Sequence, residues 1–155
     1  MKFSAREDIE APINYVFDQL TDFQAFERSA LRRGAEVQRV DNKTVPGVGM
    51  AWDIAFKWRG KMRELKMELT GLDAPNCMVL SSRSPSMGGD MMVDLVPLSR
   101  GRTRVSMDLG LRPKTLSSRL LVQSLKLARS NLASRYAMRV AELARDLEDR
   151  YKRSA

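Results

Sequence analysis

The chain has 155 residues, with 27 Lys and Arg against 19 Asp and Glu, ten Met, one Cys and no His. This length fits one domain, residues 1–155, with a core of its own, and no run of eighteen apolar residues predicts a membrane-spanning helix. Without histidine the chain lacks Ser-His-Asp and Cys-His catalysis, and with a single cysteine it shows no zinc site, so no metal or cofactor is predicted.

Four elements are predicted before the first glycine-bearing loop. Pro12 fits the first position of a helix, where its missing N–H is not needed. Thr21 begins a segment with capping-box spacing, so a second short helix is expected directly after the first. In chain order these elements are a strand at 3–10, short helices at 12–20 and 23–33, and a strand at 35–40.

A β-hairpin is the clearest prediction in the middle of the chain. Apolar and polar residues alternate along 50–58 and again along 64–69, which is the period of a strand with one buried face. A two-residue turn at Gly60-Lys61 then sets the register and places Asp53 opposite Glu68 on the polar face. The pairs predicted on the other face are Trp58 with Arg63, Phe56 with Leu65, Ile54 with Met67, and Trp52 with Leu69.

Three further strands and one long helix complete the predicted order. The strands, at 77–83, 91–95 and 105–111, are separated by turns. A single helix from 115 to 151 is predicted, with Thr115 as its N-cap, because apolar residues recur every three or four positions in one stripe. The stripe consists of Leu121, Leu125, Ala128, Leu132, Tyr136, Val140, Leu143 and Leu147.

Several segments together carry a family resemblance. They are Ile9-Glu10-Ala11-Pro12 after the opening strand, Val16-Phe17, Leu20-Thr21-Asp22, the glycine loop before a Trp-bearing strand, and the final helix. With these the whole chain resembles the START-like, or helix-grip (SRPBCC), superfamily, in particular its polyketide cyclase/dehydrase-like or ubiquinone-binding-like branch. The resemblance implies an α+β fold, in which a seven-stranded antiparallel sheet wraps around a long C-terminal helix and two short helices follow the first strand. Residues 23–28 depart from the Tyr-Pro-x-Phe-x-Pro-Trp stretch of that branch.

The resemblance also implies a cavity between the sheet and the short helices, in which a lipid, quinone or polyketide-like molecule is bound or carried. The inward strand residues include many Met and Trp side chains, which suit an apolar ligand of loose shape. Periodicity does not separate a hollow lining from a filled core, so a plain core is the alternative for each residue. The residues predicted to bind the ligand are Trp52, Ile54, Phe56, Trp58, Met67, Met91, Met107, Tyr136, Glu7 and Arg63.

Glu7, Arg63 and Tyr136 are the polar members of this set. At inward positions they could orient a polar head group, or they could lie at a rim and reach water. Arg63 could also form a cation–π pair with Trp58. The three are the visible acid–base candidates for the second hypothesis, an enzyme of the cyclase/dehydrase type, but no catalytic residue is assigned.

The basic excess supports a third hypothesis, an adaptor that meets an anionic membrane surface or an acidic partner. Arg119, Lys126 and Arg129 share one side of the final helix, whose first acid is Glu142, although a solvated face is the simpler alternative. No aromatic interleaving or RNA-binding motif is present, so nucleic-acid binding is not predicted. The lone Cys77 suits a reducing cytoplasm, the polar N-terminus does not resemble a secretory signal, and the oligomeric state stays open.

Overall fold

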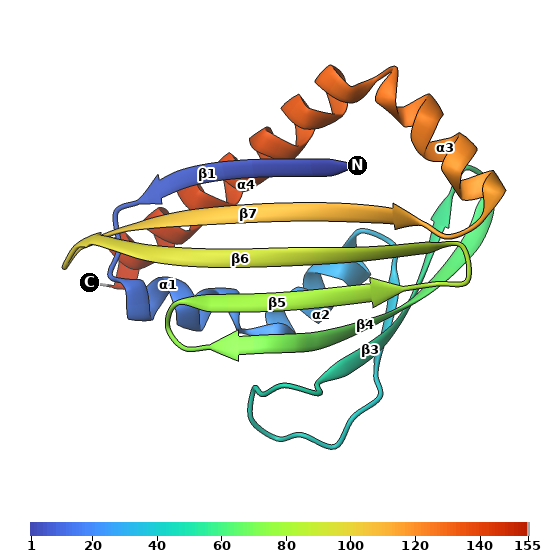
Figure 1. Cartoon of the computed structure of the whole chain (residues 1–155). Helices are drawn as coiled ribbons and strands as arrows, with labels where there is room; N and C mark the ends of the chain where they lie inside the picture. The colour runs from blue at the N-terminus through green and yellow to red at the C-terminus, as the bar shows by residue number, and fades with distance from the viewer. Residues whose placement is uncertain (155) are drawn as a thin grey trace.

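The structure, a computed structural model that describes residues 1–154, contains one antiparallel sheet and four helices (Figure 1). The seven strands lie in the order β1-β7-β6-β5-β4-β3-β2. The predicted α+β helix-grip architecture, with two short helices after the first strand and a long helix at the end, is confirmed. The elements are β1 Lys2–Ile9, α1 Ile13–Leu20, α2 Phe23–Arg32, β2 Glu36–Arg39, β3 Ala51–Trp58, β4 Lys61–Asp73, β5 Cys77–Arg83, β6 Met87–Ser99, β7 Arg102–Pro113, α3 Leu116–Lys126 and α4 Arg129–Ser154.

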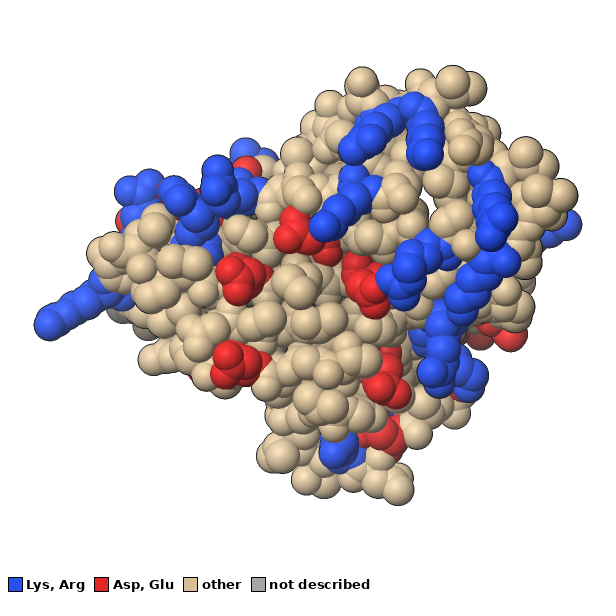
Figure 2. Space-filling view, viewed as in Figure 1, with Lys and Arg blue, Asp and Glu red and all other residues tan. Residues whose placement is uncertain are grey.

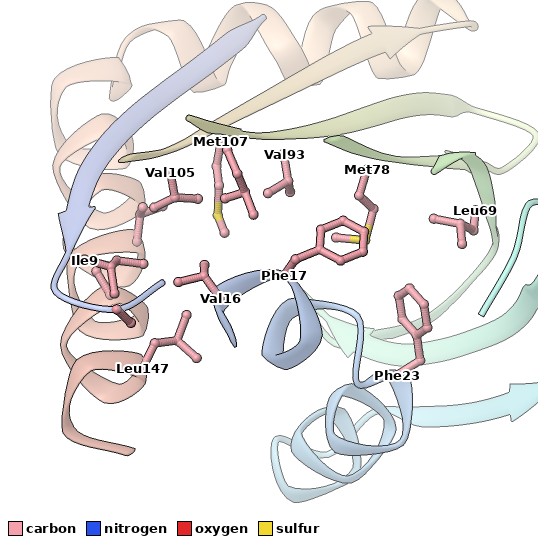
Figure 3. Packing of buried hydrophobic residues seen from close by; sticks show 14 of the residues in the cluster. Ile9, Val16, Phe17, Phe23, Leu69, Met78, Val93, Val105, Met107 and Leu147 are labelled. Atoms are coloured by element: carbon pink, nitrogen blue, oxygen red, sulfur yellow. The ribbon is translucent and has the colours of Figure 1, made fainter. Parts of the chain in front are cut away.

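The sheet has an apolar inner face and a polar outer face, because side chains alternate along each strand. In Figure 1 the helices α1, α2 and α4 lie behind the sheet, on its inner side. Figure 3 shows Val16 and Phe17 of α1 pointing toward Met78, Val93 and Met107 of the sheet. Burial of these side chains provides the main hydrophobic stabilisation of the fold.

The register of the β3–β4 hairpin differs from the predicted one by two residues. The turn is Arg59-Gly60, with positive φ at both residues (51° and 76°), which is the pattern of a type I′ turn. Phe56 therefore pairs with Arg63, and the other inward residues keep the predicted face because the shift is even. Asp53 pairs with Lys66 in place of the predicted Glu68, and an ion pair of 3.4 Å replaces the expected like-charge contact.

The predicted single helix at 115–151 is wrong in one respect, since it is broken at Leu127-Ala128 into α3 and α4. Thr115 caps α3 as predicted, because its hydroxyl accepts from the backbone N–H of Ser118. At the break the backbone forms tight i to i−3 hydrogen bonds, and the hydroxyl of Ser124 donates to the carbonyl of Leu121 at 2.7 Å. Such back-bonding bends helices, and Figure 1 shows α3 turned sharply away from α4.

Candidate functional site

The deeper half of the inner face is filled by side chains of the protein itself. Trp52 has no exposed surface, and its ring centroid lies 5.3 Å from that of Phe23 and 6.1 Å from that of Phe26. Its indole N–H donates a 2.9 Å hydrogen bond to Glu27 Oε1. These contacts join α2 to β3, so that Trp52 has no face open to a ligand in this structure.

The space between α1 and the sheet is closed as well. Phe17 and Leu20 meet Met78, Val93 and Leu95 there, and the space between them admits no water molecule. The resemblance implies a cavity at this place, but the large side chains on α1 and the sheet fill it. A ligand on the inner face therefore has to lie further along the strands.

The other half of the inner face, toward the β3–β4 and β5–β6 turns, is only half-buried. Met67, Ser82, Gly89 and Leu111 lie side by side on four neighbouring strands, and Ser82 and Gly89 add little side-chain volume to this row. The centre of this row is thus formed by two small residues, and Gly89 is itself buried beneath Ser82 and Leu111. We call this region the open end; its half-buried inward residues are Phe56, Arg63, Leu65, Met67, Leu80, Ser82, Met91, Leu109 and Leu111.

The two C-terminal helices form an arch at the open end (Figure 1). Leu121, Leu125 and Leu132 belong to the stripe predicted to face the sheet, yet all three are only half-buried. The bend at Leu127-Ala128 holds this part of the arch away from the sheet. Apolar surface therefore remains uncovered both on the arch and on the inner face, where an apolar ligand can gain from burying it.

Arg63 is the charged residue of the open end. Its guanidinium carbon lies 5.4 Å from the ring centroid of Trp58, so the proposed cation–π contact is present although the two residues are not directly paired. Within residues 1–154 its Nε is the one buried side-chain nitrogen or oxygen without a hydrogen-bond partner. Arg63 also forms no ion pair with any described residue. A buried donor without an acceptor is costly, and a ligand oxygen would satisfy it.

Tyr136 holds α4 against the sheet near the same region. Its hydroxyl donates a 2.8 Å hydrogen bond to the carbonyl of Met107, and its ring lies 5.9 Å from that of Phe3. Burial, and to a lesser extent the charge of Asp108, raise the pKa of the Tyr136 hydroxyl above its usual value. The hydroxyl is therefore neutral and already engaged, which suits a structural role.

Glu7 faces inward from β1, where it pairs with Val105. It is half-buried and makes no ion pair with a described residue, Arg63 included. β1 and β4 are separated by three other strands. The structure thus does not bring this carboxylate and the Arg63 guanidinium into one charged pair.

Two concavities lie on the outer face of the sheet. Two grooves of about 620 and 370 Å³ share Asp53, Lys66, Arg83 and Lys114, of which the three strand residues point outward in the register. Lys66 is paired with Asp53 and Lys114 donates to the carbonyl of Ser84. The first groove is also lined by Val37, Leu65 and Pro85, so this surface is of mixed polarity.

The residues predicted to bind a ligand thus separate by depth. The filled half contains Trp52, Ile54 and Met107. The open end contains Phe56, Arg63, Met67 and Met91, with Tyr136 beside them. Trp58 is exposed at the hairpin tip, and Glu7 lies on β1. Leu80 and Leu109 at the open end were not among the predicted binding residues. Their alternation predicts that they face inward, and both are half-buried. Residues 1–154 hold no group of three or more His, Cys, Asp or Glu placed to bind a metal.

Comparison with known proteins supports the fold alone. No protein-family model matches the chain, and no curated protein matches it in sequence. A protein from Thermus thermophilus has a TM-score of 0.67 at 17% identity and covers 100% of this chain and 99% of its own. The Zhui aromatase/cyclase from a Streptomyces species has a TM-score of 0.67 at 12% identity, covering 97% and 95%. A START superfamily protein from Mycobacterium smegmatis has a TM-score of 0.56 at 12% identity, covering 86% and 95%. The chain therefore has the START-like fold.

Proposed function

We propose that the protein binds and carries a hydrophobic small molecule at the open end of its sheet. The apolar part of the ligand lies between the half-buried strand residues and the arch, and a polar or negatively charged head group accepts a hydrogen bond from Arg63. The observation that carries this proposal is the buried Arg63 Nε without a partner, in a residue that pairs with Phe56 and lies over the Trp58 ring. The START-like fold, seen also in the Zhui aromatase/cyclase, supports the same class of ligand.

The energetics favour an amphipathic molecule over a purely apolar one. Covering half-buried Leu, Met and Phe side chains contributes roughly 25 cal/mol for each Å² removed from water. A ligand carboxylate or carbonyl would add a hydrogen bond to a charged donor, typically about 1.5–3 kcal/mol. A lipid, a quinone or a polyketide-like molecule each supplies both parts.

A cyclase- or dehydrase-type reaction is the second candidate, supported by the fold shared with an aromatase/cyclase. It needs an acid–base group close to the bound ligand. Arg63 and Glu7 are not in contact, and the hydroxyl of Tyr136 is engaged with Met107. Carriage without turnover is therefore the function that the geometry supports best, and turnover of a polyketide-type substrate would favour the enzyme.

The test is a titration with cis-parinaric acid, a fluorescent fatty acid, and with the corresponding alcohol. We expect saturable binding of both probes to the wild-type protein. Arg63→Gln should weaken binding of the acid about tenfold, which is the loss of one charged hydrogen bond, and change binding of the alcohol much less. Arg59→Gln is the matched control, because Arg59 also lies over Trp58, at 4.6 Å, but at the exposed turn.

Two results would overturn the proposal. One is that neither fatty probe, nor any member of a quinone and polyketide panel, binds in a saturable way. The other is that Arg63→Gln and Arg59→Gln lose affinity equally, which would mean that general surface charge attracts the probe. Folding of each variant is checked by its thermal unfolding midpoint.

A further inference from the structure

We infer that α3 and the turn after it form a docking surface for a negatively charged lipid bilayer. Three leucines on this segment are exposed to an extent that is unusual for apolar side chains. Leu116, Leu120 and Leu127 are 74%, 63% and 92% exposed. None of the helices described for residues 1–154 could span a bilayer. The contact proposed is one in which a helix lies on the bilayer surface.

The three leucines form one stripe of their own. Their spacing of four and seven residues places them within about 40° of one another around the helix axis. Ser118 and Val122, the buried residues of α3, lie on the opposite side. The helix therefore has one side packed on the protein and a second, apolar side facing solvent, and no residue among 1–154 covers the second side.

The basic residues next to this leucine stripe indicate that its partner is negatively charged. Arg119 and Lys126 flank it on one side, and both are exposed. Seven Lys and Arg and no acid occur between Asp108 and Glu142. Figure 2 shows basic side chains over the α3 side of the molecule and a second group at the opposite end, with most acidic side chains of this face between them. An exposed leucine stripe beside basic residues is typical of helices that lie in the headgroup region of anionic membranes.

An anionic membrane fits this surface better than a second copy of the chain. Two copies meeting through α3 would bring their basic residues together without an acid to pair them, which is destabilising. A bilayer offers both an apolar layer for the leucines and negative headgroups for the cations. Because α3 follows β7 at the open end, docking would also place that end close to the lipid.

The test measures cosedimentation of the full chain with vesicles, in the absence of any added ligand. Vesicles of phosphatidylcholine with roughly one third phosphatidylserine are compared with phosphatidylcholine alone. We expect binding to the anionic vesicles, at least about tenfold weaker binding to the neutral ones, and a steep loss with salt. Because no ligand is present, failure here and failure of the proposed function are separate outcomes.

Two matched pairs of variants identify the surface. The triple variant Leu116→Gln, Leu120→Gln, Leu127→Gln keeps all charges and should bind at least about tenfold more weakly. Its control replaces Met92, Val96 and Leu98, which are exposed apolar residues on β6, by Gln. Arg119→Glu with Lys126→Glu should abolish binding, whereas Arg145→Glu with Arg150→Glu, exposed on α4, should reduce it only slightly.

Three outcomes would overturn the inference. They are no binding to anionic vesicles, equal losses in the α3 variants and their controls, and full binding by the leucine variant. A dimer in analytical ultracentrifugation that the leucine variant abolishes would assign the stripe to a second copy of the chain. All these positions are exposed, so the variants should fold, and thermal unfolding verifies this for each.

Discussion

The guanidinium carbon of Arg63 lies 5.4 Å from the ring centroid of Trp58, and that of Arg59 lies 4.6 Å from the same centroid. The two cations thus share one aromatic ring, yet their surroundings differ. Arg59 belongs to the exposed turn, while Arg63 faces inward with a buried Nε that has no acceptor. Arg59 is therefore an ordinary surface cation, whereas Arg63 has a free hydrogen-bond donor that a ligand can accept from.

Arg63→Met is expected to leave the free protein as stable as the wild type, or about 1 kcal/mol more stable, because it removes an unsatisfied buried donor and retains an apolar stem. The same variant should lose affinity for an anionic amphiphile. Urea unfolding of Arg63→Met and of the control Arg59→Met measures the first effect. Destabilisation by more than about 2 kcal/mol with unchanged ligand affinity would show that Arg63 is structural.

Ser82→Leu is expected to fill the open end. Ser82 lies in the inner row between Met67 and Gly89, and the larger side chain would occupy space that the ligand needs. We expect affinity for cis-parinaric acid to fall at least about tenfold with a change in stability below roughly 1.5 kcal/mol. Ser106→Leu, on the outer face of β7, is the control and should bind as the wild type does. Equal binding by both variants would place the ligand elsewhere.

The two tryptophans should differ sharply in their contribution to stability. Trp52→Phe is expected to cost about 2–3 kcal/mol, because it leaves a cavity in the core and removes the hydrogen bond to Glu27. Trp58→Phe should cost less than about 1 kcal/mol, since Trp58 is 36% exposed. Chemical unfolding of both variants measures this difference. A larger loss for Trp58→Phe would contradict the assignment of Trp52 to the filled half.

Asp41 should make stability depend on pH in the acid range. It accepts hydrogen bonds from Arg39 and from the backbone N–H groups of Lys43 and Ala51, at 2.9, 2.8 and 2.8 Å. Arg39 first, and then these N–H groups, hold the pKa of Asp41 well below its usual 3.8. The ionised carboxylate therefore stabilises the folded state above pH 3.8, and this contribution is lost as the pH falls through the lower folded-state value.

The corresponding measurement compares wild type with Asp41→Asn. The variant should be the less stable protein at neutral pH, and the difference between the two should shrink steadily below pH 3.8. Asp8 and Asp90 also have lowered pKa values, through Arg104 and Arg112, so both proteins weaken in acid and only their difference is diagnostic. A difference independent of pH would mean that the carboxylate charge does not matter.

Alternation was sufficient to predict the sheet, and Thr115 was correctly predicted as the cap of α3. Both short helices are present, but their first residues differ from the prediction: Pro12 is the N-cap of α1 and not its first helical residue, and Asp22, not Thr21, caps α2. The hairpin register was wrong because Arg59, unlike most non-glycine residues, adopts a positive φ, which moves the turn back by one residue. The inward face was still correct, since the resulting shift of two residues preserves it. Alternation therefore predicts which side chains of a strand face inward more reliably than it predicts which residues pair across two strands.

Two features of the candidate site could not be predicted. The apolar stripe continues through Leu125, Ala128 and Leu132 without Gly or Pro, so nothing in the pattern shows the bend between α3 and α4. Periodicity also assigns Trp52 and Met67 to the same face, although one is sealed beneath α2 and the other lies at the open end. How deeply an inward side chain is buried depends on which helix covers it, and helix position is set by tertiary packing and not by the periodicity of the strand.

Native mass spectrometry of protein purified without detergent tests whether the protein carries an amphipathic molecule. We expect an additional mass that is lost on denaturation and that organic extraction identifies as an amphipathic molecule with a polar or anionic head. Occupancy should be lower in Arg63→Gln and unchanged in Arg59→Gln. A clean mass of the polypeptide alone, together with no thermal shift across a panel of lipids, quinones and polyketides, would contradict it.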